Sequence, residues 1–317
     1  MKGMEAAVAL GLVSGDVTSG LNILSTLEVN AQEKAEALLG KGIIELTLVE
    51  GVPPLFIEVR LVASDKVLGA RVINNHSKVE VLEGEELDRP IFFKAEIEDV
   101  GNINYGLSDI YEFVSTVPFS EIGFLLNAAK TNMEIANYSL EQGYGIGVGK
   151  ITLDSYKKGV DEGINSIDRL FRIGASMAAA ASDARMSGCP MPVVINSGSG
   201  NQGITVPLSV MAEGLNSDGE KLARALCIAH LVALMITEKK GRLSALCGAF
   251  TAAIGTATGY LWLLGGTYGD IESCIDIMIA NLIGILCDGA KVSCALKIYS
   301  CVEAASLAVK IALAGST

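Results

Sequence analysis

The chain has 317 residues, half of them apolar, and carries 36 acidic against 24 basic side chains for a formal net charge of −12. This length allows two domains or one large domain. The acidic balance argues against nucleic acid and against an anionic membrane surface as partners, because binding to either relies on Lys and Arg.

The N-terminal part is predicted to be helical over residues 1–38, with a break at SGDVTSG. Its second half, NAQEKAEALLGKG, has the composition of a helix and stops at Gly40. Residues 1–40 therefore form the first of three predicted parts.

After Gly40 the pattern changes from helical to alternating. Apolar and polar residues alternate in four stretches separated by turn residues, namely GIIELTLVE, PLFIEVRLVAS, KVLGARVINN and SKVEVLEG. This period is typical of an antiparallel sheet with one face toward water. The sequence predicts three or four strands in a sheet module over residues 41–105.

From Ser108 the pattern is helical almost to the end of the chain. The candidate helices are 108–116, 119–138, 154–187, 204–215, 219–239, 243–263, 271–286 and 290–313. Residues 106–317 therefore form a helical domain. The predicted fold class is α+β, with a small antiparallel sheet module set within a larger, mostly helical body.

One stretch is long enough to cross a bilayer, because Leu243 to Gly269 contains no charged residue. It is rich in Gly, Ala, Ser and Thr, and its ends lack a positive-inside bias. A buried core helix or helix pair is the preferred interpretation, and a membrane span is the alternative. The start of the sequence has no signal-peptide pattern, and the cysteines are odd in number. We therefore expect a cytoplasmic location, with thiols free or metal-bound.

Two loops are rich in glycine. INSGSGNQGITVP, residues 195–207, places small residues before a helix start, where exposed N–H groups can bind a carboxylate or phosphate. A capped helix start behind a tight turn is the alternative. GYGIGVGK, residues 143–150, matches neither dinucleotide-binding nor Walker spacing and is interpreted as a loop between helices.

The chain has only two histidines. His76, in INNHSKV, lies at a predicted strand turn among polar neighbours, a setting suited to proton transfer or substrate contact. An exposed turn histidine without a role is the alternative. His230 lies within an apolar helical face and is interpreted as a core residue, so no Ser–His–Asp arrangement is predicted.

The sequence CDGAKVSC, residues 287–294, places two of the seven cysteines seven positions apart. In a continuous helix this spacing is a rise of about 10.5 Å, too long for both thiols to bind one small ion. A wider body such as an iron–sulfur cluster could bridge them, as could a local break at Gly289. Because Cys287, Cys294 and Cys301 recur every seven residues, a buried helical stripe of thiols is the alternative.

Three stretches together point to a known family. SDARMSGCPMPVVINSGSGNQGI, GRLSALCGAFTAAIGTATG and CDGAKVSCALKI resemble the L-cysteine desulfidase family, which is related to the alpha chain of iron–sulfur L-serine dehydratase. The resemblance extends over essentially the whole chain and includes NNHS, where the family has a similar His-Thr turn.

The resemblance implies a carbon–sulfur lyase that splits L-cysteine into pyruvate, ammonia and sulfide without pyridoxal phosphate. It implies a [4Fe–4S] cluster held by Cys247, Cys287 and Cys294, with one iron open to the small amino-acid substrate. The loop would hold the substrate carboxylate through Ser197, Gly198, Ser199, Gly200, Asn201 and Gln202. The other thiols, Cys189, Cys227, Cys274 and Cys301, are expected in the core. A homodimer is plausible because of the apolar, small-residue helices.

The sequence departs from the family at its start. The family pattern begins with a GCTEP-type motif whose cysteine acts as base or nucleophile, whereas KGMEAAVALGLVSGD matches a later part of that pattern. We expect the cluster site to survive this difference, with His76 as the remaining candidate catalytic residue. The alternatives are an L-serine dehydratase-like deaminase and an inactive homologue that binds a small molecule.

Overall fold

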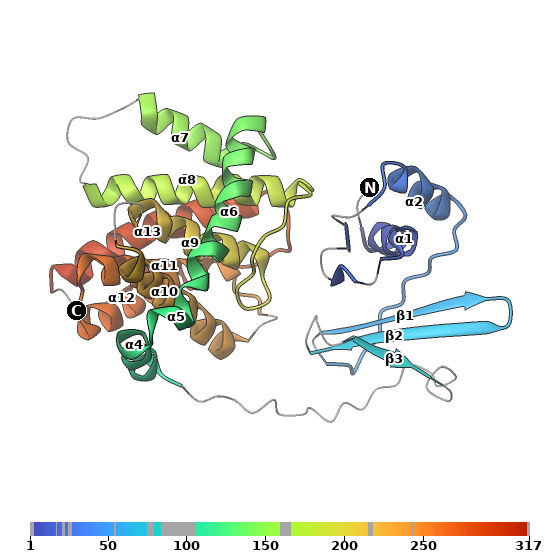
Figure 1. Cartoon of the computed structure of the whole chain (residues 1–317), viewed down its shortest axis with the longest axis horizontal. Coiled ribbons are helices and arrows are strands. Elements are labelled where there is room, and N and C mark those ends of the chain that lie inside the picture. Colours follow the sequence, from blue (N-terminus) through green and yellow to red (C-terminus); the bar gives the residue numbers. More distant parts are fainter. Residues whose placement is uncertain are drawn as a thin grey trace. The chain divides into compact units, whose positions relative to one another are not determined.

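A computed structural model describes residues 3–16, 18–20, 23–24, 27–53, 55–74, 79–83, 105–158, 166–214, 218–241 and 244–315. By its internal contacts the chain divides into two compact units, Met1–Asn102 and Ile103–Thr317. The first unit holds the sheet and the second is helical, as the ribbon shows (Figure 1).

The N-terminal unit begins with two helices, α1 (Met4–Ser14) and α2 (Ala31–Gly40). Three strands follow, β1 (Phe56–Ala63), β2 (Lys66–Ile73) and β3 (Val79–Leu82), in the order β1-β2-β3 with both pairs antiparallel. The small antiparallel sheet is therefore confirmed. Residues 43–49, within the first of the four candidate stretches, form no strand.

The two faces of this sheet differ sharply in chemistry. Ile57, Val59 and Leu61 lie on one face, and each is more than a third exposed. On the opposite face the Glu58 side chain is only 2% exposed and bridges Arg60 at 2.7 Å and Arg71 at 3.0 Å. The alternating pattern is present, but in this unit the charged face is the more covered one.

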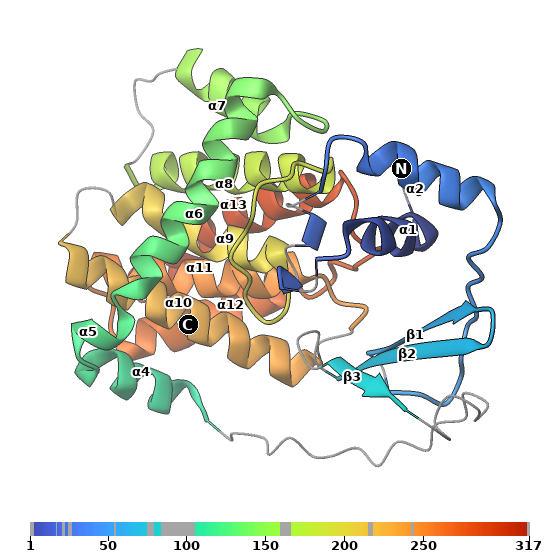
Figure 2. The same cartoon turned by 45° about the vertical axis from the view of Figure 1, so that its right-hand side comes forward.

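Within its described residues, the C-terminal unit contains helices and no named strand. They are α4 (Leu107–Thr116), α5 (Phe119–Ile122), α6 (Phe124–Gln142), α7 (Val148–Lys158), α8 (Ser166–Met186), α9 (Gly200–Gly214), α10 (Gly219–Lys240), α11 (Gly248–Leu264), α12 (Tyr268–Leu282) and α13 (Cys294–Leu313). Helices α8 and α13 contact each other and lie side by side in both views (Figure 2). The predicted α+β fold class is confirmed.

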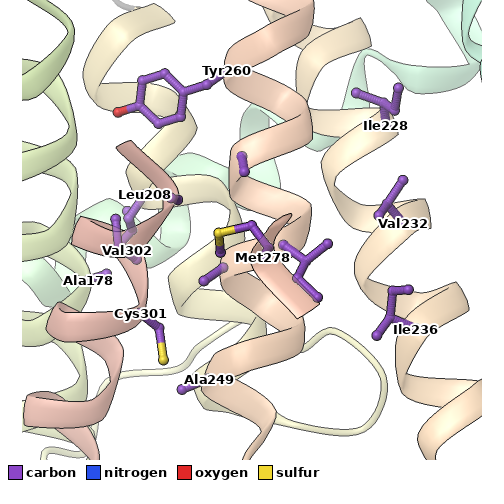
Figure 3. Close-up of a cluster of buried hydrophobic side chains, with 14 of the residues drawn as sticks. Ala178, Leu208, Ile228, Val232, Ile236, Ala249, Tyr260, Met278, Cys301 and Val302 are labelled. Atoms are coloured by element: carbon purple, nitrogen blue, oxygen red, sulfur yellow. The ribbon is translucent and has the colours of Figure 1, made fainter. Parts of the chain in front are cut away.

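Helix α11 lies at the centre of this unit and contacts α9, α10, α12 and α13. Its small residues allow close helix approach, and nearly all of its side chains are buried. Tyr260 stacks on Phe171 with ring centroids 3.8 Å apart, and its hydroxyl donates to the Ser209 carbonyl at 2.7 Å. The core also gathers Leu208 of α9 and Met278 of α12 (Figure 3).

The uncharged stretch that could have crossed a bilayer is thus largely this core helix. Across the described parts of the chain, no helix combines the length and the hydropathy needed to span a membrane.

Candidate functional site

Two of the predicted ligand cysteines are brought together by a short antiparallel bridge between Leu246 and Leu286. The flanking main-chain hydrogen bonds measure 2.9 Å at the Cys247 N–H and 2.7 Å at the Cys287 N–H. Because side chains alternate along paired strands, both thiols project to the same face of the bridge. Diagonal neighbours of this kind lie about 7–8 Å apart.

The third predicted ligand, Cys294, is the first residue of α13. The chain between Cys287 and Cys294 is not helical, and Gly289 adopts a positive φ of 95°. The Lys291 N–H lies 3.5 Å from the Cys294 sulfur, which folds this segment back on itself. The seven-residue spacing is therefore a loop with a break at Gly289, and the continuous helix considered for it is wrong.

The three thiols are close enough for their charges to interact. Burial is the main cause that raises the pKa of Cys247, and the nearby Cys287 and Cys294 raise it further. Cys247 is only 8% exposed, whereas Cys287 is exposed and Cys294 is half-buried. The site therefore offers one buried thiol and two that solvent can reach.

Lysines surround the thiols in this strongly acidic chain. The ammonium of Lys297 donates to the Leu286 carbonyl at 2.9 Å and also pairs with Asp288. This hydrogen bond to Asp288 is the main cause that raises the pKa of Lys297, and Cys247 and Cys287 add to it. Burial lowers the pKa of Lys240, and the charges of Cys247 and Cys287 act in the opposite direction and raise it. Positive charge of this kind favours the thiolate, which is the form that binds metals.

The spacing of the three thiols determines whether they can bind a single metal ion or a larger metal cluster. Within the described ranges, no three His, Cys, Asp or Glu side chains are grouped closely enough to hold one metal ion. Three thiols from separate segments, set apart but mutually interacting, fit the thiolate donor set of an iron–sulfur cluster. The residues present have the donor chemistry of the group that the resemblance implies, and a cluster bound by all three stays a prediction.

The predicted substrate loop forms a tight hairpin turn. The backbones of Asn196 and Ser199 exchange hydrogen bonds of 3.1 and 2.8 Å, and the two central residues, Ser197 and Gly198, have φ of 51° and 74°. Two successive positive φ angles define a type I′ turn. The Ser199 hydroxyl then accepts the Gln202 N–H at 3.3 Å at the start of α9. A capped helix start behind a tight turn thus describes this loop, and anion binding by its N–H groups stays a prediction.

Gln202 of α9 is buried in the core and forms hydrogen bonds to both α10 and α11. Its side chain is 4% exposed, and its oxygen accepts from Thr237 of α10 at 3.0 Å and from Thr251 of α11 at 2.9 Å. A side-chain carbon added at Gly248, next to Cys247, would stand 3.0 Å from its nitrogen. Gln202 therefore links the loop to the segment that carries the buried thiol.

His230 of α10 lies at this loop. The amide nitrogen of Asn196 donates to its Nδ1 at 2.9 Å and to its main-chain oxygen at 3.2 Å. An amide NH₂ only donates, so Nδ1 is the acceptor and the ring proton is on Nε2. Burial lowers the pKa of His230 to about 4, so the imidazole is neutral at pH 7. The other histidine, His76, lies outside the described residues.

Arg185, near the end of α8, also reaches the loop. Its Nη1 donates to Asn201 Oδ1 at 3.2 Å, and its charge interacts with the Cys294 thiol. Sequence reasoning did not single out Arg185, Lys240 or Lys297, because no spacing marks them. Arg185 does lie within the stretch SDARMSGCP, where a polar cluster interrupts an alanine-rich helix.

The remaining thiols lie elsewhere. Cys227, Cys274 and Cys301 are buried in the helical core, at 5% exposure or less, and Cys189 is half-buried against it. Of these four, Cys301 is close enough to Cys247 for that thiol to add to the burial that raises the pKa of Cys301 to about 12.

Comparison with known proteins identifies the family of the chain. The model of the serine dehydratase alpha chain family matches residues 18–317. The chain is 38% identical to a UPF0597 protein of Lachnoclostridium phytofermentans, over 99% of this chain and 74% of that protein. It is 34% identical to one from Oleidesulfovibrio alaskensis and 37% identical to YhaM, a UPF0597 protein of Salmonella typhimurium, in each case over 99% of this chain and 73% of the relative. No solved structure matches the chain significantly. The chain belongs to the serine dehydratase alpha chain family.

Proposed function

We propose that this chain is an iron–sulfur-dependent lyase that converts L-cysteine to pyruvate, ammonia and sulfide. The observation that carries the proposal is the bridge between Leu246 and Leu286, which brings the segments of Cys247 and Cys287 together beside Lys297. The charge of Cys294 also acts on Cys247. Membership in a dehydratase family supports elimination at the β-carbon of a small amino acid.

The reaction breaks three bonds of the substrate, two in the elimination and the C–N bond in the final hydrolysis. A base removes the α-proton, the Cβ–S bond breaks, and sulfide leaves with the bonding electrons. The resulting enamine takes up a proton, and water hydrolyses the imine to pyruvate and ammonia. When bound, an iron–sulfur cluster supplies a Lewis-acidic iron for the leaving sulfur.

The chain's own residues prepare the site for this reaction. Lys240 and Lys297 favour the thiolate forms that a cluster needs. The neutral His230 holds Asn196 and thereby the type I′ turn. The N–H groups of Ser197 and Gly198 have no acceptor among the described residues, so they remain free to contact a substrate carboxylate.

L-Serine is the second candidate substrate, and the name of the matching family favours it. The same elimination would then release water in place of sulfide. Because the two substrates differ only in the leaving group, they are assayed in parallel.

The first experiment is anaerobic reconstitution with iron and sulfide, followed by assay of pyruvate from L-cysteine and L-serine. Pyruvate from L-cysteine supports the proposal, and pyruvate from L-serine alone favours the second candidate. Bound iron with no product from either substrate would instead favour a small-molecule-binding homologue without lyase activity.

The thiol assignment predicts the behaviour of single variants. Cys287→Ser should lose the bound iron while the fold is kept, because Cys287 is exposed. Cys189→Ser is the matched control, since Cys189 is half-buried outside the thiol group, and its iron content should equal that of the wild type. Iron per chain and circular dichroism measure the two effects. An unchanged iron content in Cys287→Ser contradicts the assignment.

A further inference from the structure

The guanidinium of Arg185 packs against the first residues of α9. Its Nη1 donates to Asn201 Oδ1 at 3.2 Å. A side-chain carbon added at Gly200 would stand 2.4 Å from its Nε and 2.7 Å from its Cζ, so only glycine leaves room for the cation there. The guanidinium is therefore held next to the type I′ turn at 196–199.

This cation has no carboxylate partner in the described part of the chain. Elsewhere Arg224 pairs with Glu220 at 2.6 Å, and Arg60 pairs with Glu58. Arg185 is half-buried, and its one hydrogen bond to the described residues goes to a neutral amide. A guanidinium has five N–H donors, so within these residues most of them have no protein acceptor.

The position of Arg185 joins the two halves of the candidate site. On one side it contacts Asn201, the second residue after the turn, and on the other its charge interacts with the Cys294 thiol. A ligand paired with this guanidinium would lie beside Gly200 and Asn201, at the start of α9. The N–H groups of the guanidinium that Asn201 does not use can pair with an anionic group of a ligand.

We propose that Arg185 binds the carboxylate of the amino-acid substrate as a paired, two-hydrogen-bond contact. The planar fork of a guanidinium matches a carboxylate in this way, which a lysine or a single N–H does not. The inference rests on the proposed function and deepens it. Arg185 would select α-carboxylates and hold the β-carbon toward the thiols.

The test is equilibrium binding of L-alanine, which has the carboxylate and amine of the substrate but no leaving group. Titration calorimetry on the anaerobically reconstituted full chain compares the wild type with Arg185→Gln and Arg185→Lys. Loss of a charge-assisted contact should raise the Kd for L-alanine about 10- to 100-fold in Arg185→Gln. L-Alaninamide, which lacks the carboxylate, should bind wild type and variant equally weakly.

A matched control lies on the same helix. Arg172 of α8 is 48% exposed and pairs with Glu303 at 3.7 Å, away from the loop. Arg172→Gln should leave the Kd for L-alanine unchanged. If it weakens binding as much as Arg185→Gln does, general charge loss explains the effect and the inference is overturned.

A second variant tests the same contact without removing the arginine. Gly200→Ala places a methyl group where the guanidinium lies, and the flexible arginine end can move away at little cost to the fold. This variant should also raise the Kd for L-alanine, with an unchanged melting temperature. Normal L-alanine binding by Gly200→Ala would count against the contact.

Measurements of kcat and KM distinguish a failure of this inference from a failure of the proposed lyase function. With an active wild type, Arg185→Gln should raise KM far more than it lowers kcat, and an unchanged KM overturns the inference while the lyase stands. If the wild type binds L-alanine through Arg185 but forms no pyruvate, the lyase fails and the carboxylate site stands. Absence of L-alanine binding by the wild type overturns the inference.

Discussion

Ser197 shows how a single residue can combine strain with recognition. A non-glycine residue at a φ of 51° costs roughly 1–2 kcal/mol relative to an ordinary conformation. Its hydroxyl donates to Asn196 Oδ1 at 2.6 Å, a contact that offsets about 1 kcal/mol of this cost. The turn is thus held by side chains around it, and strain of this kind is typical of functional sites.

His230 supplies one of these contacts, and its protonation predicts a pH effect. Because the native pKa of about 4 lies below the ordinary value of 6.5, the unfolded chain takes up this proton more readily. The stability from neutral His230 is complete above pH 6.5 and is lost as the pH falls toward 4. The slope is at most about 1.4 kcal/mol per pH unit.

Urea unfolding of the wild type and of His230→Gln at pH 5, 6 and 7 measures this effect. The wild type should lose unfolding free energy relative to the variant as the pH falls. A constant difference across this range would mean that the native pKa of His230 equals that of the unfolded chain, as for an exposed imidazole.

At the scale of elements, the glycine-rich loop before α7 is organised by a buried carboxylate of α8. Asp183 is 1% exposed, and its Oδ2 lies 3.4 Å from the Gly149 N–H. No partner for its Oδ1 is found within the described residues. Burial is the main cause that raises the pKa of Asp183, although main-chain N–H groups of residues 146–149 oppose it. The loop that superficially resembles a nucleotide-binding motif thus surrounds a carboxylate of the chain itself.

The raised pKa of Asp183 predicts a pH effect of opposite sign to that of His230. The native state holds this proton more tightly than the unfolded chain, whose carboxyl titrates near 3.8. The associated stability is therefore present below pH 3.8 and is lost as the pH rises through the native pKa. Asp183→Asn, which does not titrate, should gain unfolding free energy relative to the wild type between pH 4 and pH 7. A gain at low pH instead would contradict the assignment.

Element positions were largely predictable from the sequence, and the exceptions have physical causes. The strands β1 and β2 and most helices of the second unit follow the expected periods within a few residues. Residues 43–49 alternate like a strand but pair with none of the residues that the structure describes, because alternation alone does not supply a partner. The helix expected from residue 290 begins only at Cys294, after the break at Gly289.

At the scale of the whole molecule, local pattern could not predict contacts between distant segments. The meeting of Arg185 with Asn201, and of Asn196 with His230, depends on how α8, α9 and α10 pack. Sequence reasoning therefore placed His230 in the core, where its neighbours are apolar along its own helix. The three thiols were grouped by resemblance alone, since their spacing matches no metal motif.

The bridge between Leu246 and Leu286 also has a topological consequence. It joins the two ends of a segment of about forty residues that contains all of α11 and α12. A group bound to both Cys247 and Cys287 would close that segment into a loop. Loop-closure entropy lost from the unfolded chain would then add about 4 kcal/mol to the stability, as a disulfide does.

We therefore expect the anaerobically reconstituted protein to unfold at higher urea concentration than the iron-free chain, and Cys287→Ser to lose that difference. Equal midpoints for the two forms of the wild type would show that no such crosslink exists. A cofactor bound to both thiols would crosslink the centre of the helical unit. Oxygen that removed such a cofactor would therefore lower the stability of the folded chain as well as any activity that depends on the cofactor.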